Sequence, residues 1–302
     1  MAQLRHRAQI LGAALLFSTG GAAIKATTLT SWQVASFRSG VAALMVLLLM
    51  RDARRGWSWH TLPVGAAYAA TMVLFVAANK LTTSANTIFL QSAAPLYVLL
   101  LSPLLLREKI RGRDVGFMAV VAVGMLLFFV ERPAAAATAP DPRLGNLLAA
   151  VSGLFWAATI MGFRWMGSRP GSDGNTIPSV VAGNAIAFLV CLPMALPVRA
   201  VPMDWAVIGY LGIFQIGAAY LLLATGIRHV AAVEASTLLL LEPAVNPFWA
   251  WLVHGETPGA WSLAGGALIL GSTLAKTLLD SRRGGIDADA RARGGDVRVA
   301  SD

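Results

Sequence analysis

The chain has 302 residues, of which 57% are hydrophobic and only 13% are charged, and its mean hydropathy is +0.66. Soluble domains average about 45–50% apolar residues, with glycine counted, and about 25% charged residues. A globular core of this size has no room for so much apolar surface, so the excess is predicted to face lipid. This composition argues against a soluble enzyme, a disordered protein and a nucleic-acid-binding protein.

The chain is strongly basic, with a net charge of +9 and a pI near 10.6. Its basic residues stand in short clusters between long apolar runs, which is typical of a membrane topology signal and not of a nucleic-acid surface. The single cysteine, Cys191, lies inside an apolar run. One cysteine excludes an intramolecular disulfide and a metal site with several thiolate ligands.

The apolar runs predict ten transmembrane helices, because a membrane helix needs about 20 mainly apolar residues. Runs such as 98–106 do not alternate as the strands of a β-barrel would. Arg38 interrupts one helix, and Glu234 and Glu242 interrupt another. The ten helices are expected at roughly 8–27, 32–50, 62–80, 84–106, 112–131, 144–167, 177–197, 204–226, 231–254 and 259–279.

The first predicted helix resembles a secretory signal peptide, because Arg5 and Arg7 precede an apolar run. The run is long, Lys25 interrupts the region where cleavage would occur, and nine further spans follow. A retained first helix is therefore predicted.

Lys and Arg near the ends of the spans predict the orientation. With the N-terminus inside, the cytoplasmic segments carry eighteen of these residues and the external segments carry five. Both termini are therefore predicted to be cytoplasmic, in a multi-pass protein of the bacterial inner (plasma) membrane. The tail, 280–302, is rich in Gly, Asp and Arg and is predicted to be disordered.

An internal repeat relates the two halves of the chain. The segment APLYVLLLSPLLLRE matches EPAVNPFWAWLVHGE at an offset of 148 residues, which places Pro95 on Pro243 and Glu108 on Glu256. Both glutamates end their helices and are expected to be structural, organising the turns that follow. The loop after the fourth predicted helix, REKIRGR, is basic, whereas its counterpart after the ninth, HGETPGA, carries no Lys or Arg.

Two further matches support the repeat. Lys80 aligns with Arg228 at the same offset, and 17–25 aligns with 156–164 at an offset of 139. The cations that end these last two segments, Lys25 and Arg164, are expected to extend toward the membrane surface.

Five spans in each half mean that the second copy enters the membrane upside down. The fold class predicted is an all-α integral membrane protein of ten transmembrane helices in two inverted five-helix repeats. The first repeat is expected at 1–131, an external loop at 132–143 and the inverted repeat at 144–279. Such repeats are typical of secondary transporters, whose substrate site lies at the repeat interface. A duplicated membrane protein that transports nothing is the alternative.

The stretch TLLLLEPAVNPFWAWLVHGETP, followed by LAGGALILGSTLAK, resembles the EamA-type members of the drug/metabolite transporter (DMT) superfamily, and LQSAAPLYVLLLSPLLLREKI is its first-half partner. The resemblance covers 8–279, and the chain looks most similar to the YddG-type amino-acid exporters of the bacterial inner membrane. It implies a basket of ten helices around a central cavity formed by helices 1, 3, 4, 6, 8 and 9. Helices 5 and 10 would lie at the periphery or at a homodimer surface.

Glu242 is the acidic residue predicted to lie deepest in the membrane. It stands about eleven residues into the ninth predicted helix, or about 16 Å along its axis, near the midplane. Such a group is expected to bind the amino group of a substrate or to carry a proton. The structural alternative is a protonated carboxyl group that satisfies backbone freed by Pro243.

Two more sets of side chains are candidates for the cavity. Neutral amides can bind an amino acid without the desolvation cost of full charges, and aromatic rings can enclose bulky apolar side chains. The alternatives are hydrogen bonds between helices for the amides and lipid contact for the rings. The amides are Asn79, Gln91, Gln215 and Asn246, and the aromatic residues are Phe17, Tyr68, Tyr97, Trp156 and Tyr220.

Four residues are candidate hinges for alternating access. Gly20 and Gly21 lie in the first predicted helix, where close helix packing explains them equally well. Pro95 and Pro243 are better candidates, because both halves keep a proline at the same place.

Other chemistries are not supported by any motif. The chain has no phosphate-binding G-x-x-x-x-G-K-[ST] loop, no H-E-x-x-H and no G-x-S-x-G. No catalytic residue, cofactor or metal ion is predicted, and an integral-membrane enzyme is disfavoured.

The function expected is secondary transport by alternating access through a central cavity. The partners expected are membrane lipid and a small-molecule substrate, but no nucleic acid. The cargo would be an exported amino acid, aromatic or otherwise bulky and apolar such as Met, or a related small metabolite. Another solute, such as a drug, nucleoside or nucleotide sugar, is the rival.

Overall fold

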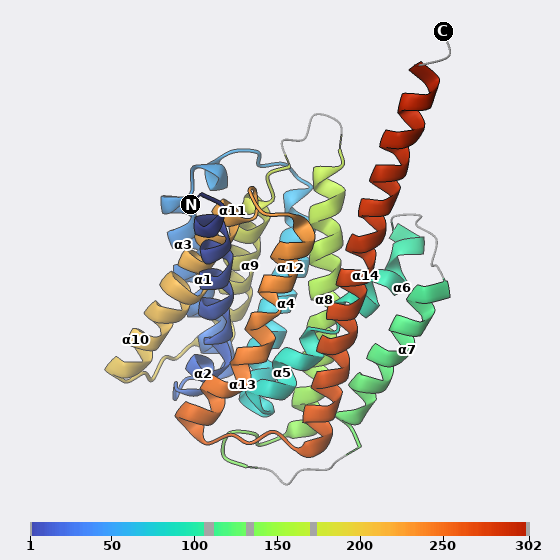
Figure 1. Cartoon of the computed structure of the whole chain (residues 1–302). Coiled ribbons are helices and arrows are strands. Elements are labelled where there is room, and N and C mark those ends of the chain that lie inside the picture. The colour runs from blue at the N-terminus through green and yellow to red at the C-terminus, as the bar shows by residue number, and fades with distance from the viewer. Residues whose placement is uncertain (1, 106–111, 131–135, 170–173, 300–302) are drawn as a thin grey trace.

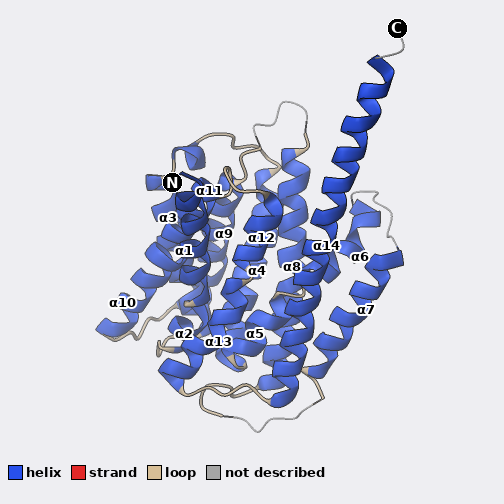
Figure 2. Ribbon diagram, in the orientation of Figure 1, coloured by secondary structure: helices blue, strands red, loops and turns tan. Residues whose placement is uncertain are grey.

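The computed structural model describes residues 2–105, 112–130, 136–169 and 174–299. In these ranges the regular structure is helical (Figure 2), apart from an isolated bridge between Ala136 and Ala139. The helices stand side by side in one bundle (Figure 1), and the chain begins and ends at the same end of it. The other end, where the first segment finishes and the second begins, is named the Lys25 end.

The described helices form ten consecutive antiparallel segments, as the sequence predicts, although several segments are interrupted. They are α1–α2 (Ala2–Ser18, Gly20–Lys25), α3 (Ser31–Leu49), α4 (Thr61–Leu81), α5–α6 (Ser84–Gln91, Ala94–Leu105), α7 (Gly112–Leu127), α8 (Pro142–Gly167), α9 (Ile177–Ala195), α10–η2–α11 (Pro202–Tyr210, Leu211–Ala218, Ala219–Gly226), α12–α13 (Ala232–Leu239, Leu241–His254) and α14 (Ala260–Val299), with a short 3₁₀ helix η1 (Arg51–Arg54) after α3.

Local sequence explains where several helices begin. The Thr30 hydroxyl accepts a hydrogen bond from the Gln33 backbone, and the Gln33 side chain accepts one from the Thr30 backbone, which is a capping box that starts α3. Asp141 accepts a hydrogen bond from the Leu144 backbone at the start of α8, and Pro142 occupies the first helical position.

Eight of the described segments are long and apolar enough to cross a membrane. The two that are not among them are α7, whose apolar part is shorter, and the ninth segment, α12–α13. Ten helical segments are confirmed, and eight of them are candidate spans.

The fourth and ninth segments break at equivalent places. α5 ends at Gln91 and α6 begins at Ala94, while α12 ends at Leu239 and α13 begins at Leu241. Ser92 and Leu240, which lie in the two breaks, are 148 residues apart, the same offset that aligns the sequence repeat. A proline follows each break within three residues, and a proline lacks the N–H that would continue the helix across it.

The eighth segment contains an eight-residue π-helix, η2, between α10 and α11. π-Helical turns are rare and frequently occur at functional sites. η2 packs against α3. A methyl group added at Gly212 of η2 would lie 2.5 Å from Val41 of α3, so this contact requires a residue without a side chain.

The two halves of the chain interleave. α4 packs on α8 and α9, α3 packs on α9 and η2, and α1 packs on α11. α14 packs on α7, and both lie at one edge of the bundle (Figure 1). At that contact, a methyl group added at Gly265 would lie 2.5 Å from the carbonyl oxygen of Gly124.

The last helix is the longest of the described elements. The backbone of α14 continues as a helix to Val299 and extends beyond the bundle (Figure 1), and the disorder expected for 280–302 stays a prediction. A membrane-embedded helix provides a formed turn on which further residues can add, and Ala and Arg in this segment favour helix.

Candidate functional site

The first segment is interrupted at Thr19, between α1 and α2. The interruption leaves backbone carbonyl groups without helical partners, and side chains from the second half of the chain bind them. The Asn246 amide donates to the Ser18 carbonyl over 2.9 Å, and the Gln215 amide donates to the Phe17 carbonyl over 3.4 Å. Two amides that were candidates for substrate binding thus stabilise a broken helix.

The two glycines after this break are closely packed. A methyl group added at Gly21 would lie 1.6 Å from the hydroxyl oxygen of Ser84, and one added at Gly20 would lie 2.8 Å from the amide nitrogen of Gln215. The glycines therefore let α2 approach α5 and η2 directly. Their role as hinges stays a prediction.

Three of the predicted cavity aromatics meet in one cluster, named the aromatic cluster: Phe17 of α1, Tyr68 of α4 and Tyr220 of α11. The Phe17 and Tyr220 rings are 5.3 Å apart and the Tyr68 and Tyr220 rings are 6.1 Å apart, both edge to face. Tyr68 is fully buried, whereas Phe17 and Tyr220 are half-buried. The other two predicted aromatics, Tyr97 and Trp156, are half-buried and make no ring contact with this cluster in the described part of the chain.

Arg38 of α3 lies near the aromatic cluster, within range of electrostatic interaction with both of its phenol groups. Its side chain is 1% exposed. Its described polar contacts are two long ones to Met72, 3.4 Å to the carbonyl oxygen and 3.5 Å to the sulfur, and its Nε has no acceptor. The sequence did not single out Arg38 as a site residue, although the signal was present: it is a lone cation inside an apolar run.

Glu242 lies in the first turn of α13, just after the break at Leu240. It is half-buried, and no described residue forms an ion pair or hydrogen bond with its carboxylate. The N-terminus of a helix carries a partial positive charge, which favours a carboxylate at this position. The carboxylate also interacts electrostatically with Tyr220, so it lies near the aromatic cluster.

The other two predicted amides make local and interhelical contacts. Gln91, at the end of α5, donates to the Ser152 hydroxyl of α8 over 2.8 Å. That hydroxyl donates in turn to the Thr71 carbonyl of α4 over 3.1 Å. Asn79 donates to the Phe75 carbonyl in its own helix over 3.0 Å, while its side-chain oxygen has no partner among the described atoms.

A buried ion pair closes the Lys25 end. The Lys25 ammonium lies 2.9 Å from the Glu256 carboxylate, with both side chains 3% exposed. Lys25 also donates to the Thr82 carbonyl over 2.7 Å, and Glu256 accepts from the Ser84 backbone over 2.9 Å at the start of α5. The expectation that Lys25 extends to the membrane surface is wrong, because Glu256 and backbone carbonyls hold it inside. Glu108, the repeat counterpart of Glu256, lies outside the described residues.

The link between α2 and α3 is fastened at the same end. Lys80 donates to the Thr27 carbonyl over 2.7 Å. Asp204 accepts from the Thr28 backbone over 2.8 Å and from the Thr28 hydroxyl over 2.7 Å. The first two helices are thereby tied to α4 and to α10.

At the opposite end two of the described ion pairs are exposed. Arg228 and Asp52 form a pair of 2.6 Å with side chains 62% and 44% exposed. Arg7 pairs with Glu234, and these side chains are also partly exposed. A third pair at this end, between Lys276 of α14 and Asp114 of α7, is 2.6 Å long and better shielded, with side chains 23% and 8% exposed.

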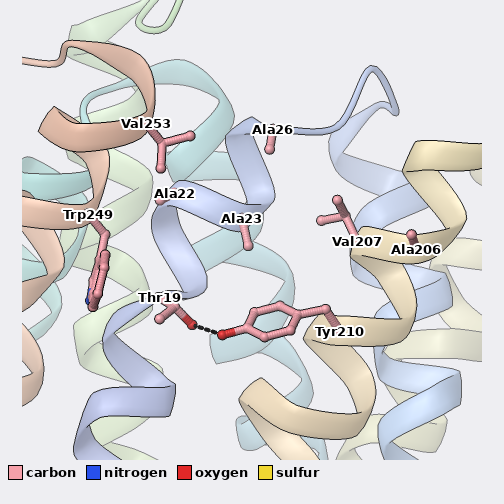
Figure 3. A pocket seen from close by; sticks show the side chains of 9 residues that line it. All are labelled: Thr19, Ala22, Ala23, Ala26, Ala206, Val207, Tyr210, Trp249 and Val253. Atoms are coloured by element: carbon pink, nitrogen blue, oxygen red, sulfur yellow. Dashed lines mark hydrogen bonds between the residues drawn. The ribbon is translucent and has the colours of Figure 1, made fainter.

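An apolar pocket of about 410 Å³ lies beside the break in the first segment, between α2, α10 and α13 (Figure 3). At its inner edge the Thr19 and Tyr210 hydroxyl groups share a hydrogen bond of 2.8 Å. Its lining is otherwise alanine, valine and one tryptophan ring. The lining residues are Thr19, Ala22, Ala23, Ala26, Ala206, Val207, Tyr210, Trp249 and Val253.

No group of three or more His, Cys, Asp or Glu side chains within the described ranges is arranged to hold a metal ion. The candidate site consists of the buried cation of Arg38, the carboxylate of Glu242 and the aromatic cluster with its two phenols and the Phe17 ring. Such an arrangement can bind and orient a small charged solute, and it contains no nucleophile activated by a neighbouring base.

The model of the EamA-like transporter family matches residues 8–130 and 143–277. The chain belongs to the EamA-like transporter family. The family lies within the DMT superfamily and consists of carriers, not enzymes, as the sequence predicts. The protein is accordingly a multi-pass membrane transporter.

Two curated relatives and one solved structure resemble the chain over most of its length. The pseudopaline exporter CntI of Pseudomonas aeruginosa, in strains UCBPP-PA14 and PAO1, is 26% identical over 272 residues, which is 87% of this chain and 92% of the relative. A protein crystal structure with 19% sequence identity superposes with a TM-score of 0.60, covering 92% of this chain and 98% of the other. At that identity the superposition supports the fold alone.

Proposed function

We propose that the protein is a secondary transporter that exports amino acids with aromatic or other bulky apolar side chains, such as Met, or related small metabolites. The observation that carries the proposal is the aromatic cluster beside Arg38 and Glu242, inside a chain of the EamA-like transporter family. The aromatic rings can pack against an apolar side chain of the solute, and the charges of Arg38 and Glu242 can bind its polar groups. The outward direction is supported by the exporter function of the Pseudomonas relatives.

The proposed architecture is a pair of inverted repeats, 1–131 and 144–279, joined by an external loop at 132–143. Two separate matches to one family model support it. So do the helix breaks at Ser92 and Leu240, which lie at the repeat offset. We propose that both termini are cytoplasmic, in a bacterial inner membrane, with the Lys25 end outside; the distribution of Lys and Arg along the sequence supports this orientation.

In the proposed cycle the structure represents a state closed at the Lys25 end. Breaking the Lys25–Glu256 pair and releasing the α2–α3 link would open that end. The segments that bear Pro95 and Pro243 are already interrupted, so they can bend without breaking further helical hydrogen bonds. The solute would then be exposed first to one side and then to the other.

Counterflow in proteoliposomes tests the function. Purified protein is reconstituted, the vesicles are loaded with one unlabelled amino acid at a time, and uptake of the labelled compound is followed with and without a pH gradient. Saturable flux of Met or of an aromatic amino acid is expected. Empty vesicles are the control, and absence of flux for every amino acid would overturn the assignment.

The same assay separates the competing mechanisms. If the vesicles transport a nucleoside, nucleotide sugar or drug and no amino acid, the protein is a transporter of that other solute. If a pH gradient has no effect on flux and Glu242→Gln retains it, Glu242 is not a proton carrier, and export is facilitated diffusion.

A further inference from the structure

Arg38 is a buried cation that lacks a counter-ion. Among the described residues the other buried or half-buried cations have carboxylate or carbonyl partners at short distance: Arg7 with Glu234, Lys25 with Glu256, Lys80 with Thr27 and Lys276 with Asp114. Arg38 is more deeply buried than these, and no described carboxylate lies within ion-pair distance of it. A guanidinium has five N–H donors, so two long contacts to Met72 leave most of them unused.

An unpaired charge at membrane depth is costly, so it usually serves a function or has a partner. The free-energy cost of burying the Arg38 charge is explained if its counter-ion is an anionic ligand that binds and dissociates.

The two phenols of the aromatic cluster are polar groups near Arg38. Tyr68 is fully buried, and Tyr220, whose ring lies 6.1 Å from it, is half-buried. Both phenols interact with the Arg38 charge. A hydroxyl group held in the field of a cation is a good donor to a carboxylate.

A group of opposite charge, Glu242, also lies near Tyr220. The carboxylate of Glu242 interacts with the Tyr220 phenol and has no described ion-pair or hydrogen-bond partner. Arg38 and Glu242 are not within ion-pair distance of each other. One ligand with an anionic and a cationic group can satisfy both of them, with its apolar part against Phe17 and Tyr220.

We propose that Arg38 and Glu242 are the two poles of a site for a compound that carries both a carboxylate and an amine. The carboxylate binds at the phenols of Tyr68 and Tyr220 in the field of Arg38, and the amine binds at Glu242. This proposal rests on the proposed function and specifies the substrate class: the charged ends are recognised together, and neither end is sufficient.

Ligand-dependent thermal shifts of the purified full-length protein test it with three probes. Methionine has both charged groups, methioninamide lacks the carboxylate, and N-acetylmethionine lacks the amine. Methionine is expected to bind at least about tenfold more tightly than either analogue, because each charged hydrogen bond contributes that much. Equal binding of the three compounds would overturn the proposal.

Variants separate the two poles. Arg38→Gln is expected to lose the preference for methionine over methioninamide, and Arg38→Lys to keep part of it, because the charge remains. Glu242→Gln is expected to lose the preference for methionine over N-acetylmethionine. Arg228→Gln, which removes a cation from the exposed pair with Asp52, is the matched control and should retain both preferences.

The melting temperature of the ligand-free protein provides a readout that does not depend on the substrate. If the counter-ion of Arg38 is the ligand, the ligand-free protein has an unpaired buried charge. Arg38→Gln removes this charge and should melt at the same temperature as the wild type or higher. A purely structural arginine predicts a lower melting temperature and unchanged ligand preference, and that pair of results would overturn the proposal.

The experiments distinguish failure of the proposed amino-acid export from failure of the proposed binding site at Arg38 and Glu242. Counterflow of methionine by the wild type that Arg38→Gln leaves unchanged would remove the two-pole site and keep the amino-acid exporter. Absence of amino-acid flux in the wild type, with no thermal shift by any probe, would remove both.

Discussion

The Lys25 ammonium and the Glu256 carboxylate are 2.9 Å apart, and each side chain is only 3% exposed. The pair joins the end of the first segment to the loop between α13 and α14, so it connects the two halves of the chain. Glu256 also accepts a hydrogen bond from the backbone at the start of α5. Opening the Lys25 end requires this pair to separate.

Removing one member of this pair should be more damaging than removing both. Glu256→Gln leaves a buried ammonium without its counter-ion, and the loss expected is about 3–5 kcal/mol of stability. The double variant Lys25→Met with Glu256→Gln should recover part of that loss, because no buried charge remains. Melting temperatures of the purified variants measure both effects.

The exposed pair between Arg228 and Asp52 provides the control. Arg228→Gln is expected to cost about 0–1 kcal/mol, because solvent screens that interaction. A double variant at Lys25 and Glu256 that melts no higher than Glu256→Gln alone would contradict the role given to the pair.

Gly21 should tolerate no side chain while Ser84 is present. In Gly21→Ala the new methyl group would lie 1.6 Å from the Ser84 hydroxyl oxygen and 3.0 Å from its Cβ. A strong loss of folded protein is expected, measured as the monodisperse fraction in size-exclusion chromatography. Adding Ser84→Gly removes both atoms and should restore part of it.

The matched control for this prediction is Gly209→Ala in α10, where an added methyl group meets nothing within 4 Å. A gain of about 0.5–1 kcal/mol is expected there, because alanine favours a helix over glycine. If Gly21→Ala behaves like Gly209→Ala, α2 does not pack on α5 as closely as described.

Asn246 should be needed for stability through its contacts on both sides. Its amide donates to the Ser18 carbonyl over 2.9 Å, and its oxygen accepts from the Ser84 hydroxyl over 2.8 Å. Asn246→Ala leaves a buried carbonyl at the break without a donor, so a loss of about 1–3 kcal/mol is expected. Thermal unfolding monitored by tryptophan fluorescence measures it.

Thr225→Ala is a suitable comparison, because the exposed Thr225 hydroxyl bonds only to carbonyls of its own helix. It should change stability by no more than about 0.5 kcal/mol. Equal effects of the two substitutions would mean that the Ser18 carbonyl does not depend on Asn246.

Pro95 and Pro243 should keep two segments interrupted. Pro95→Ala supplies an N–H that can bond to the carbonyl four residues earlier, so the break at Ser92 is expected to heal. Hydrogen exchange of the amides between Leu90 and Leu96 should slow, counterflow should fall, and the melting temperature should stay or rise. Pro243→Ala should act in the same way around Leu240.

Pro202→Ala is the control for these two variants. Pro202 occupies the first position of α10, where no helical N–H bond is lost. It should alter neither exchange nor flux. Faster flux in Pro95→Ala or Pro243→Ala would contradict a hinge at the breaks.

Much of the fold follows from the sequence, because each crossing of a membrane needs its own apolar run. Most of the ten segments were predicted close to their observed bounds, although the first begins earlier, at Ala2, and the last continues to Val299. The repeat offset of 148 also relates the two helix breaks at Ser92 and Leu240. The break at Thr19 and the π-helix at 211–218 were not predicted. They have no strong local signal, because partners from other segments stabilise them.

The sequence by itself determined where the helices lie and which residues are charged inside them, because hydropathy is a property of each segment alone. Only the tertiary structure decided which charges have partners. Lys25 meets Glu256, 231 positions away, while Arg38 meets two phenols and no described carboxylate. Those contacts depend on how helices from the two halves pack together, and spacing along one helix carries no information about a neighbour.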